Sequence, residues 1–120
     1  MIVTEERGTI VVVDADLMAM ARLRDAAGRV GWDVLTATKD NLSGRLEGNS
    51  VRLLVLDLDR GGIELIDSVS ALRDTNVDFP RVLAYYSHID EELGASALSS
   101  GFETYPRGRF WRSLDELLDN

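Results

Sequence analysis

Several residue types that carry common chemistries are absent or nearly absent from this chain of 120 residues. There is no cysteine, which excludes disulfide bonds, thiol catalysis and thiolate metal sites. His88 is the only histidine, so a metal centre built from several histidines is excluded as well. Lys39 is the only lysine, and every other basic residue is an arginine. Chemistry in this chain therefore depends on carboxylates, hydroxyls and guanidinium groups.

The net charge is −8, from 13 basic and 21 acidic residues. This acidic balance argues against a nucleic-acid module, which needs clustered basic residues, and against docking on an anionic membrane. No apolar run reaches the about 18 residues that a membrane span needs, and the polar N-terminus is not typical of a signal peptide. We therefore expect a cytoplasmic protein with protein partners, no nucleic acid and no membrane contact.

Apolar, β-branched runs alternate along the chain with amphipathic stretches. The runs predict five strands, over residues 9–13, 33–37, 51–57, 81–86 and 102–105. The amphipathic stretches predict five helices, over residues 17–30, 39–47, 63–73, 88–99 and 110–118, with Ser87 as the cap of the fourth.

This alternation is typical of an α/β fold in which helices cover both faces of a parallel sheet. The leading topology at this length is the flavodoxin-like, doubly wound five-stranded sheet in the order 2-1-3-4-5. Val11, Val13, Leu54 and Leu56 should then be buried. We expect one domain over residues 1–120, with residues 1–8 as a flexible N-terminal segment.

Acidic residues follow two strands that are neighbours in this topology. Asp14 and Asp16 follow the first strand, and Asp57 and Asp59 follow the third. Ligands of open α/β sheets bind at the carboxyl ends of the strands, so these four residues form a candidate acidic pocket. Carboxylates are suitable ligands for Mg²⁺. They are equally suitable as solvated or amide-capping acids, and Ser87 as a helix cap.

Four stretches together resemble the receiver domain of bacterial response regulators, the CheY-like family: residues 10–14, 54–57, 83–87 and 101–105. The resemblance implies that Asp57 accepts a phosphoryl group from a histidine kinase. It also implies that acids after the first strand help to bind Mg²⁺, and that Ser87 and Tyr105 are switch residues.

Two departures from the family pattern affect this chemistry. Ala15 stands where a second adjacent acid is expected, and Gly108 stands at the position of a lysine that pairs with the phosphoryl group. Arg107 or Arg109 is left to supply a cation there. Because a metal ion and a cation offset the charge of phosphoryl transfer, we expect weak Mg²⁺ binding and degraded or absent phosphorylation of Asp57.

The predicted function is that of an atypical receiver, or pseudo-receiver, in signal transduction, and not that of an enzyme. The sequence stops at Asn120, so we expect a stand-alone domain that acts on a protein partner or forms a homodimer. The candidate interface comprises Tyr105, Arg107, Arg109 and Trp111.

Two alternatives remain. One is a functional receiver of a two-component phosphorelay, with Asp57 as phosphoryl acceptor and weak Mg²⁺ binding. The other is a small phosphatase-like or ligand-binding α/β domain. It has less support, because the turn at residues 14–16 is acidic and lacks the glycines of a phosphate-binding loop.

Overall fold

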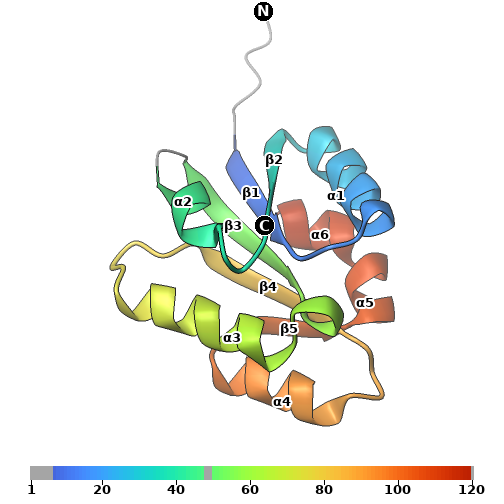
Figure 1. The fold of residues 1–120 in the computed structure, drawn as a ribbon. Helices are drawn as coiled ribbons and strands as arrows, with labels where there is room; N and C mark the ends of the chain where they lie inside the picture. Colours follow the sequence, from blue (N-terminus) through green and yellow to red (C-terminus); the bar gives the residue numbers. More distant parts are fainter. Residues whose placement is uncertain (1–6, 48–49, 120) are drawn as a thin grey trace, which may run out of the picture.

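The structure is a computed structural model and describes residues 7–47 and 50–119. Strands and helices alternate through most of the chain (Figure 1). The elements are β1 (Gly8–Val13), α1 (Leu17–Arg29), β2 (Trp32–Ala37), α2 (Leu42–Leu46), β3 (Val51–Asp57), α3 (Leu58–Asp74), β4 (Arg81–Tyr86), α4 (Glu91–Ser99), β5 (Glu103–Pro106), α5 (Arg107–Arg112) and α6 (Leu114–Asp119).

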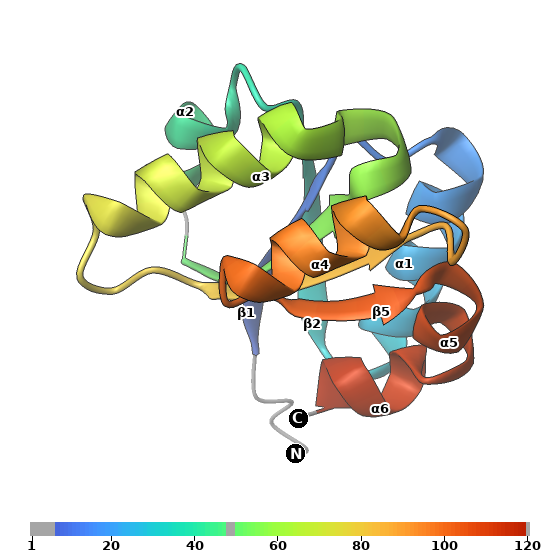
Figure 2. The ribbon, with the colours of Figure 1, turned by 90° about the horizontal axis from the view of Figure 1, so that it is seen from below.

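The five strands form a parallel sheet in the order β2-β1-β3-β4-β5, which confirms the predicted flavodoxin-like fold class. Helices α2, α3 and α4 cover one face of the sheet, and α1, α5 and α6 cover the other (Figures 1 and 2). The carboxyl ends of β1, β3 and β4 consequently meet at one edge, where ligands of such sheets bind.

The core consists of two apolar layers, one on each face of the sheet. Successive side chains of a strand point to opposite faces, so each buried strand contributes to both layers. The predicted burial of Val11, Val13, Leu54 and Leu56 is confirmed, and these side chains pack under α2, α3 and α4. The alternate positions Ile10, Val12, Leu53 and Val55 pack under α1, α5 and α6.

The predicted starts of four helices are wrong, and among them α2 begins at Leu42, three residues later than predicted. Helix α3 begins directly after β3, five residues earlier than predicted, because the Asp57 side chain caps it by accepting a hydrogen bond from the Arg60 amide. Gly61 and Gly62, which separate the strand over residues 51–57 from the helix predicted over residues 63–73, lie inside α3, and α3 bends at Gly62 (φ 63°, ψ −159°). Since this φ is strained for other residues, the bend depends on glycine.

The cap of α4 is Asp90 and not Ser87, because the Asp90 carboxylate accepts the Leu93 amide and the helix begins at Glu91. The final helix is two helices rather than one. Pro106, whose ring fixes φ near its observed −56°, immediately precedes α5, and Ser113 separates α5 from α6. Phe110, Leu114 and Leu117, the apolar residues of the helix predicted over residues 110–118, are nevertheless all buried.

Residues 1–6 of the predicted flexible segment 1–8 lie outside the described residues. Of the other two, Arg7 forms an ion pair with Asp119, and Gly8 begins β1. Within residues 7–47 and 50–119, no helix combines the length and the apolar character that crossing a membrane requires.

Candidate functional site

Asp57 is the last residue of β3, and its side chain is completely buried. Both of its carboxylate oxygens accept hydrogen bonds. Oδ1 accepts from the backbone amide of Arg60 at 3.2 Å, and Oδ2 accepts from the hydroxyl of Tyr85 at 3.0 Å. The residue that resembles a phosphoryl acceptor is therefore enclosed by the protein.

Tyr85 reaches Asp57 because the two residues are partners in the β3–β4 register. Its ring is fully buried and lies 4.7 Å from the ring of Phe110 and 5.3 Å from that of Trp111. Burial raises the pKa of Tyr85, and the neighbouring Asp57 charge raises it further. The phenol therefore remains a neutral hydrogen-bond donor at physiological pH.

Arg107, the first residue of α5, supplies the positive charge of the site. Its Nη1 lies 2.7 Å from Oδ2 of Asp59, and its Nη2 lies 3.7 Å from Oδ2 of Asp57 and 4.0 Å from Oδ2 of Asp16. Burial alone would lower the pKa of Arg107, but Asp57 and Asp59 outweigh it and the pKa is raised. We refer to Asp16, Asp57, Asp59 and Arg107 as the acidic site.

The pKa of Asp57 is raised above its usual value. Burial is the main cause, because it penalises the charged form of the carboxyl. The hydrogen bonds from Tyr85 and from the Arg60 amide, and the charge of Arg107, offset part of this effect. The ionised form of Asp57 therefore costs the folded state free energy even with these three partners.

Asp16 and Asp59 each bind a backbone amide as well as facing Arg107. Asp16 caps α1 by accepting from the Ala19 amide at 2.8 Å. Asp59 accepts from the Ser87 amide at 2.7 Å and so connects α3 to the segment after β4. Ser87 thus joins the site through its backbone.

Asp14 is placed differently from the other three acids of the predicted pocket. It has a positive φ of 61°, and it lines an open cavity of about 720 Å³ with Lys39 and Arg60. Among the described residues it takes no part in the ion pairs of Arg107. The structure therefore brings together three of the four predicted acids.

Three of the four candidate interface residues lie apart from the acidic site's ion pairs. Arg109 is exposed, and its guanidinium carbon lies 5.6 Å from the ring centre of the partly exposed Tyr105. Trp111 is also partly exposed, with the Arg22 guanidinium 4.3 Å from its ring centre. Arg107 instead directs its charge to the acids.

The donor set of the acidic site does not fit a Mg²⁺ ion in this arrangement. No cluster of three or more acidic or histidine side chains within the described residues is arranged to hold a metal ion. One oxygen of each acid is bound to an amide, and the other faces the guanidinium of Arg107.

Tyr85 is the residue of this site that the sequence does not reveal. In the sequence it is one of two adjacent aromatic residues expected to point to opposite faces of the sheet, as they do. The available signal is its position two residues before Ser87 on a strand beside the one that ends in Asp57. Only the strand register turns that position into a contact.

Comparisons with known proteins give structural matches only. No protein-family model matches the chain, and no curated protein matches it either. The receiver domain of TorR, the response regulator of the TMAO respiratory system, has a TM-score of 0.80 and 21% identity, with 94% of each chain covered. A response regulator from Thermotoga maritima has a TM-score of 0.77 and 19% identity, with 92% of this chain and 93% of that chain covered.

A third match is the Saccharomyces cerevisiae receiver domain of Ssk1, crystallised with the histidine phosphotransfer protein Ypd1. It has a TM-score of 0.73 and 13% identity, with 94% of this chain and 87% of that chain covered. Identities this low establish shared architecture. This chain has the fold of response regulator receiver domains.

Proposed function

We propose that this chain is an atypical receiver domain in two-component signal transduction, which acts through protein–protein contact without regulated phosphorylation of Asp57. The observation that carries the proposal is the complete burial of Asp57 with both carboxylate oxygens hydrogen-bonded. The receiver fold supports a signalling role rather than an enzymatic one.

Phosphorylation of Asp57 requires one of its oxygens to attack phosphorus. The attacking atom must come within about 3–3.5 Å of its target, in line with the leaving group. Here Tyr85 holds Oδ2, the Arg60 amide holds Oδ1, and the side chain has no exposed surface. A phosphoryl donor would have to displace the Tyr85 hydroxyl before reaching the nucleophile.

The negative charge of the neighbouring carboxylates also disfavours phosphorylation of Asp57. A phosphoryl group would add negative charge beside Asp16 and Asp59, which already share the single guanidinium of Arg107. Transition states of phosphoryl transfer depend on cations placed to receive this charge. The chain also has no lysine in this region, because Lys39 lies after β2 and pairs with Glu64.

The alternative is a phosphoryl-accepting receiver of a phosphorelay. The observation that favours it is the meeting of Asp57, Asp59 and Ser87 at one edge of the sheet, where Asp59 binds the Ser87 amide. This function needs a second arrangement, in which Tyr85 releases Oδ2 of Asp57 and Arg107 leaves the acids. The two functions predict different outcomes when the chain is exposed to a phosphodonor.

The chain is incubated with Mg²⁺ and a small-molecule phosphodonor, and aspartyl phosphate is detected on a phosphate-affinity gel. We expect no modified band for the wild type and none for Asp57→Asn. Tyr85→Phe removes the hydroxyl that binds Oδ2 of Asp57 and keeps the ring, so we expect phosphorylation to be faster in this variant than in the wild type. A wild-type band that disappears in Asp57→Asn would show that Asp57 accepts a phosphoryl group, and it would overturn the proposal in favour of the phosphoryl-accepting receiver.

A further inference from the structure

We infer that the guanidinium of Arg107 is a built-in replacement for a divalent cation in the acidic site, so that the site excludes Mg²⁺ while α5 is in place. The inference concerns cation binding and does not depend on whether Asp57 is ever phosphorylated. It rests on how the three carboxylates are oriented.

In each of the three carboxylates, one oxygen accepts a hydrogen bond from a backbone amide and the other faces Arg107. The Oδ1 atoms of Asp16, Asp57 and Asp59 each accept a backbone amide, from Ala19, Arg60 and Ser87 respectively. The three Oδ2 atoms all face Arg107, at 4.0, 3.7 and 2.7 Å. Among the described residues, Arg107 is the one ion-pair partner of all three acids.

The spacing of these oxygens suits a guanidinium better than a bare Mg²⁺ ion. A guanidinium is planar and presents five donors, whereas Mg²⁺ demands octahedral geometry with oxygens at about 2.0–2.1 Å. The carboxylates cannot all contract to that distance without losing amide bonds at the starts of α1 and α3 and after β4. The bonds to the Ala19 and Arg60 amides satisfy donors in the first turns of α1 and α3, which have no partner within the helix.

Removal of the guanidinium would leave the three Oδ2 atoms of Asp16, Asp57 and Asp59 without their shared ion-pair partner. A hydrated divalent cation is then a natural replacement, because Mg²⁺ in proteins commonly keeps several waters and uses one or two carboxylates. The acidic site of an Arg107→Ala variant should therefore bind Mg²⁺, although the wild-type site does not.

The test is a Mg²⁺ titration of the chain followed by NMR of the three amides that bind the acids, those of Ala19, Arg60 and Ser87. In the wild type we expect no saturable shift of these signals across the physiological millimolar range. In Arg107→Ala we expect saturable shifts, with an apparent affinity for Mg²⁺ at least about tenfold higher.

Arg109→Ala is the matched control, because it also removes an arginine from α5. The guanidinium of Arg109 lies over the ring of Tyr105 and not beside the acids. This variant should behave like the wild type. Signal dispersion in the same spectra verifies the fold of each variant. If Arg107→Ala does not fold, Arg107→Gln, which keeps a planar polar group without the charge, takes its place.

Two results would overturn the inference. One is saturable Mg²⁺ binding at these amides in the wild type. The other is a folded Arg107 variant that remains as unresponsive to Mg²⁺ as the wild type. The NMR titration reads Mg²⁺ binding without a phosphodonor and the gel assay reads phosphorylation of Asp57, so the failure of one proposal can be told from the failure of the other.

Discussion

The hydroxyl of Tyr85 donates to Oδ2 of Asp57 at 3.0 Å, and both side chains are fully buried. The two residues are register partners on adjacent strands, so the contact is part of the sheet rather than of a mobile loop. Phe110 and Trp111 pack against the Tyr85 ring and hold it in place. Opening the site therefore requires a change in the packing between β4 and α5.

Asp57→Asn should stabilise the domain at neutral pH. The folded-state pKa of Asp57 is raised, so stability falls as pH rises from the ordinary Asp value of about 3.9 to that raised pKa. Asparagine removes this cost, while Arg107 keeps its 2.7 Å contact with Asp59. A gain of about 1 kcal/mol would raise Tm by roughly 3–6 °C in a domain of this size.

The gain should shrink as pH falls through the raised pKa and vanish below about pH 3.9, where the carboxyl is protonated in both states. Thermal melts over a pH series measure it. Asp67→Asn is the control, because it removes an exposed charge from the same helix and should change little. An Asp57→Asn variant no more stable than Asp67→Asn at pH 7 would contradict the account.

The fold could be predicted from the sequence because each strand is recognisable from a short apolar run of neighbouring residues. Runs such as residues 10–13 and 53–56 are apolar throughout, as strands buried on both faces must be. The meeting of Asp16, Asp57 and Asp59 followed from strand order, since both acidic turns lie at the same end of neighbouring strands.

The hydrogen bond and the ion pairs that enclose Asp57 could not be predicted in the same way. The contact between Tyr85 and Asp57 joins residues 28 positions apart and depends on the β3–β4 register. The role of Arg107 depends on α5 starting directly after Pro106, whereas the amphipathic pattern predicted a helix from residue 110. Because that pattern depends on the buried apolar residues, it does not reveal where the first turn of the helix begins.

Ala15→Asp tests the predicted effect of the missing acid on Mg²⁺ affinity. Ala15 lies between Asp14 and Asp16, so the substitution adds a carboxylate beside the acidic site. With Arg107 present we expect little gain, because the guanidinium still neutralises the carboxylates. Combined with Arg107→Ala, the gain should exceed that of Arg107→Ala alone. Calorimetric titration measures all four proteins, and equal gains in both backgrounds would show that Arg107 does not control cation access.

Gly94→Ala should destabilise the domain by about 1–3 kcal/mol, as overpacking does. A Cβ atom at Gly94 would lie 2.4 Å from Cζ of Tyr86, so α4 or the ring of Tyr86 would have to move. Gly28→Ala in α1 is the control, because its Cβ would meet nothing within 4 Å, and it should stabilise by about 0.5–1 kcal/mol. Urea unfolding measures both, and a Gly94→Ala variant as stable as the wild type would show that this packing is not tight.

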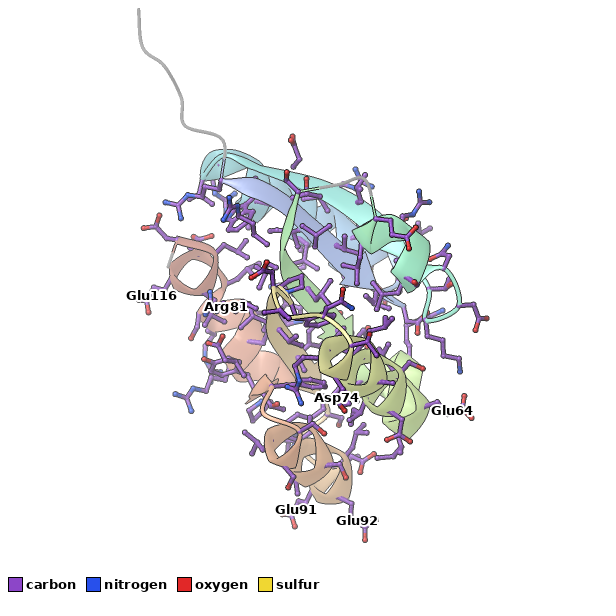
Figure 3. The ribbon with its side chains drawn as sticks, turned by 90° about the vertical axis from the view of Figure 1, so that its left-hand side faces the viewer. Glu64, Asp74, Arg81, Glu91, Glu92 and Glu116 are labelled. Atoms are coloured by element: carbon purple, nitrogen blue, oxygen red, sulfur yellow. The ribbon has the colours of Figure 1, made fainter. Side chains whose placement is uncertain are left out.

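The predicted docking surface for an acidic partner or a second copy comprises Tyr105, Arg107, Arg109 and Trp111, of which Arg107 faces the acidic site. Acidic side chains that a second copy offers include Glu91 and Glu92 on α4, which project outward at the lower edge of Figure 3. Arg109→Glu should weaken association at least about fivefold, because it reverses an exposed charge. Arg109→Glu tests the surface more specifically than Trp111→Ala, because the latter would also remove packing against Tyr85 and Phe110.

Light scattering over a range of protein and salt concentrations measures self-association, and Arg52→Glu at the opposite end of the sheet is the control for net charge. Association that persists unchanged in Arg109→Glu would rule out this face. A wild type that is monomeric at every concentration, with no partner captured through this face, would remove the prediction altogether.

The most direct test of the closed acidic site is binding of beryllofluoride, a phosphoryl mimic, in the presence of Mg²⁺. Fluorine NMR detects the bound mimic, and the amides of Arg60 and Ser87 report its position because they bind Asp57 and Asp59. Because Asp57 is buried and both of its oxygens are hydrogen-bonded, we expect no bound fluorine signal for the wild type and unchanged shifts of these two amides. A bound fluorine signal that is lost in Asp57→Asn would show that Asp57 is open to a phosphoryl group and would contradict the account.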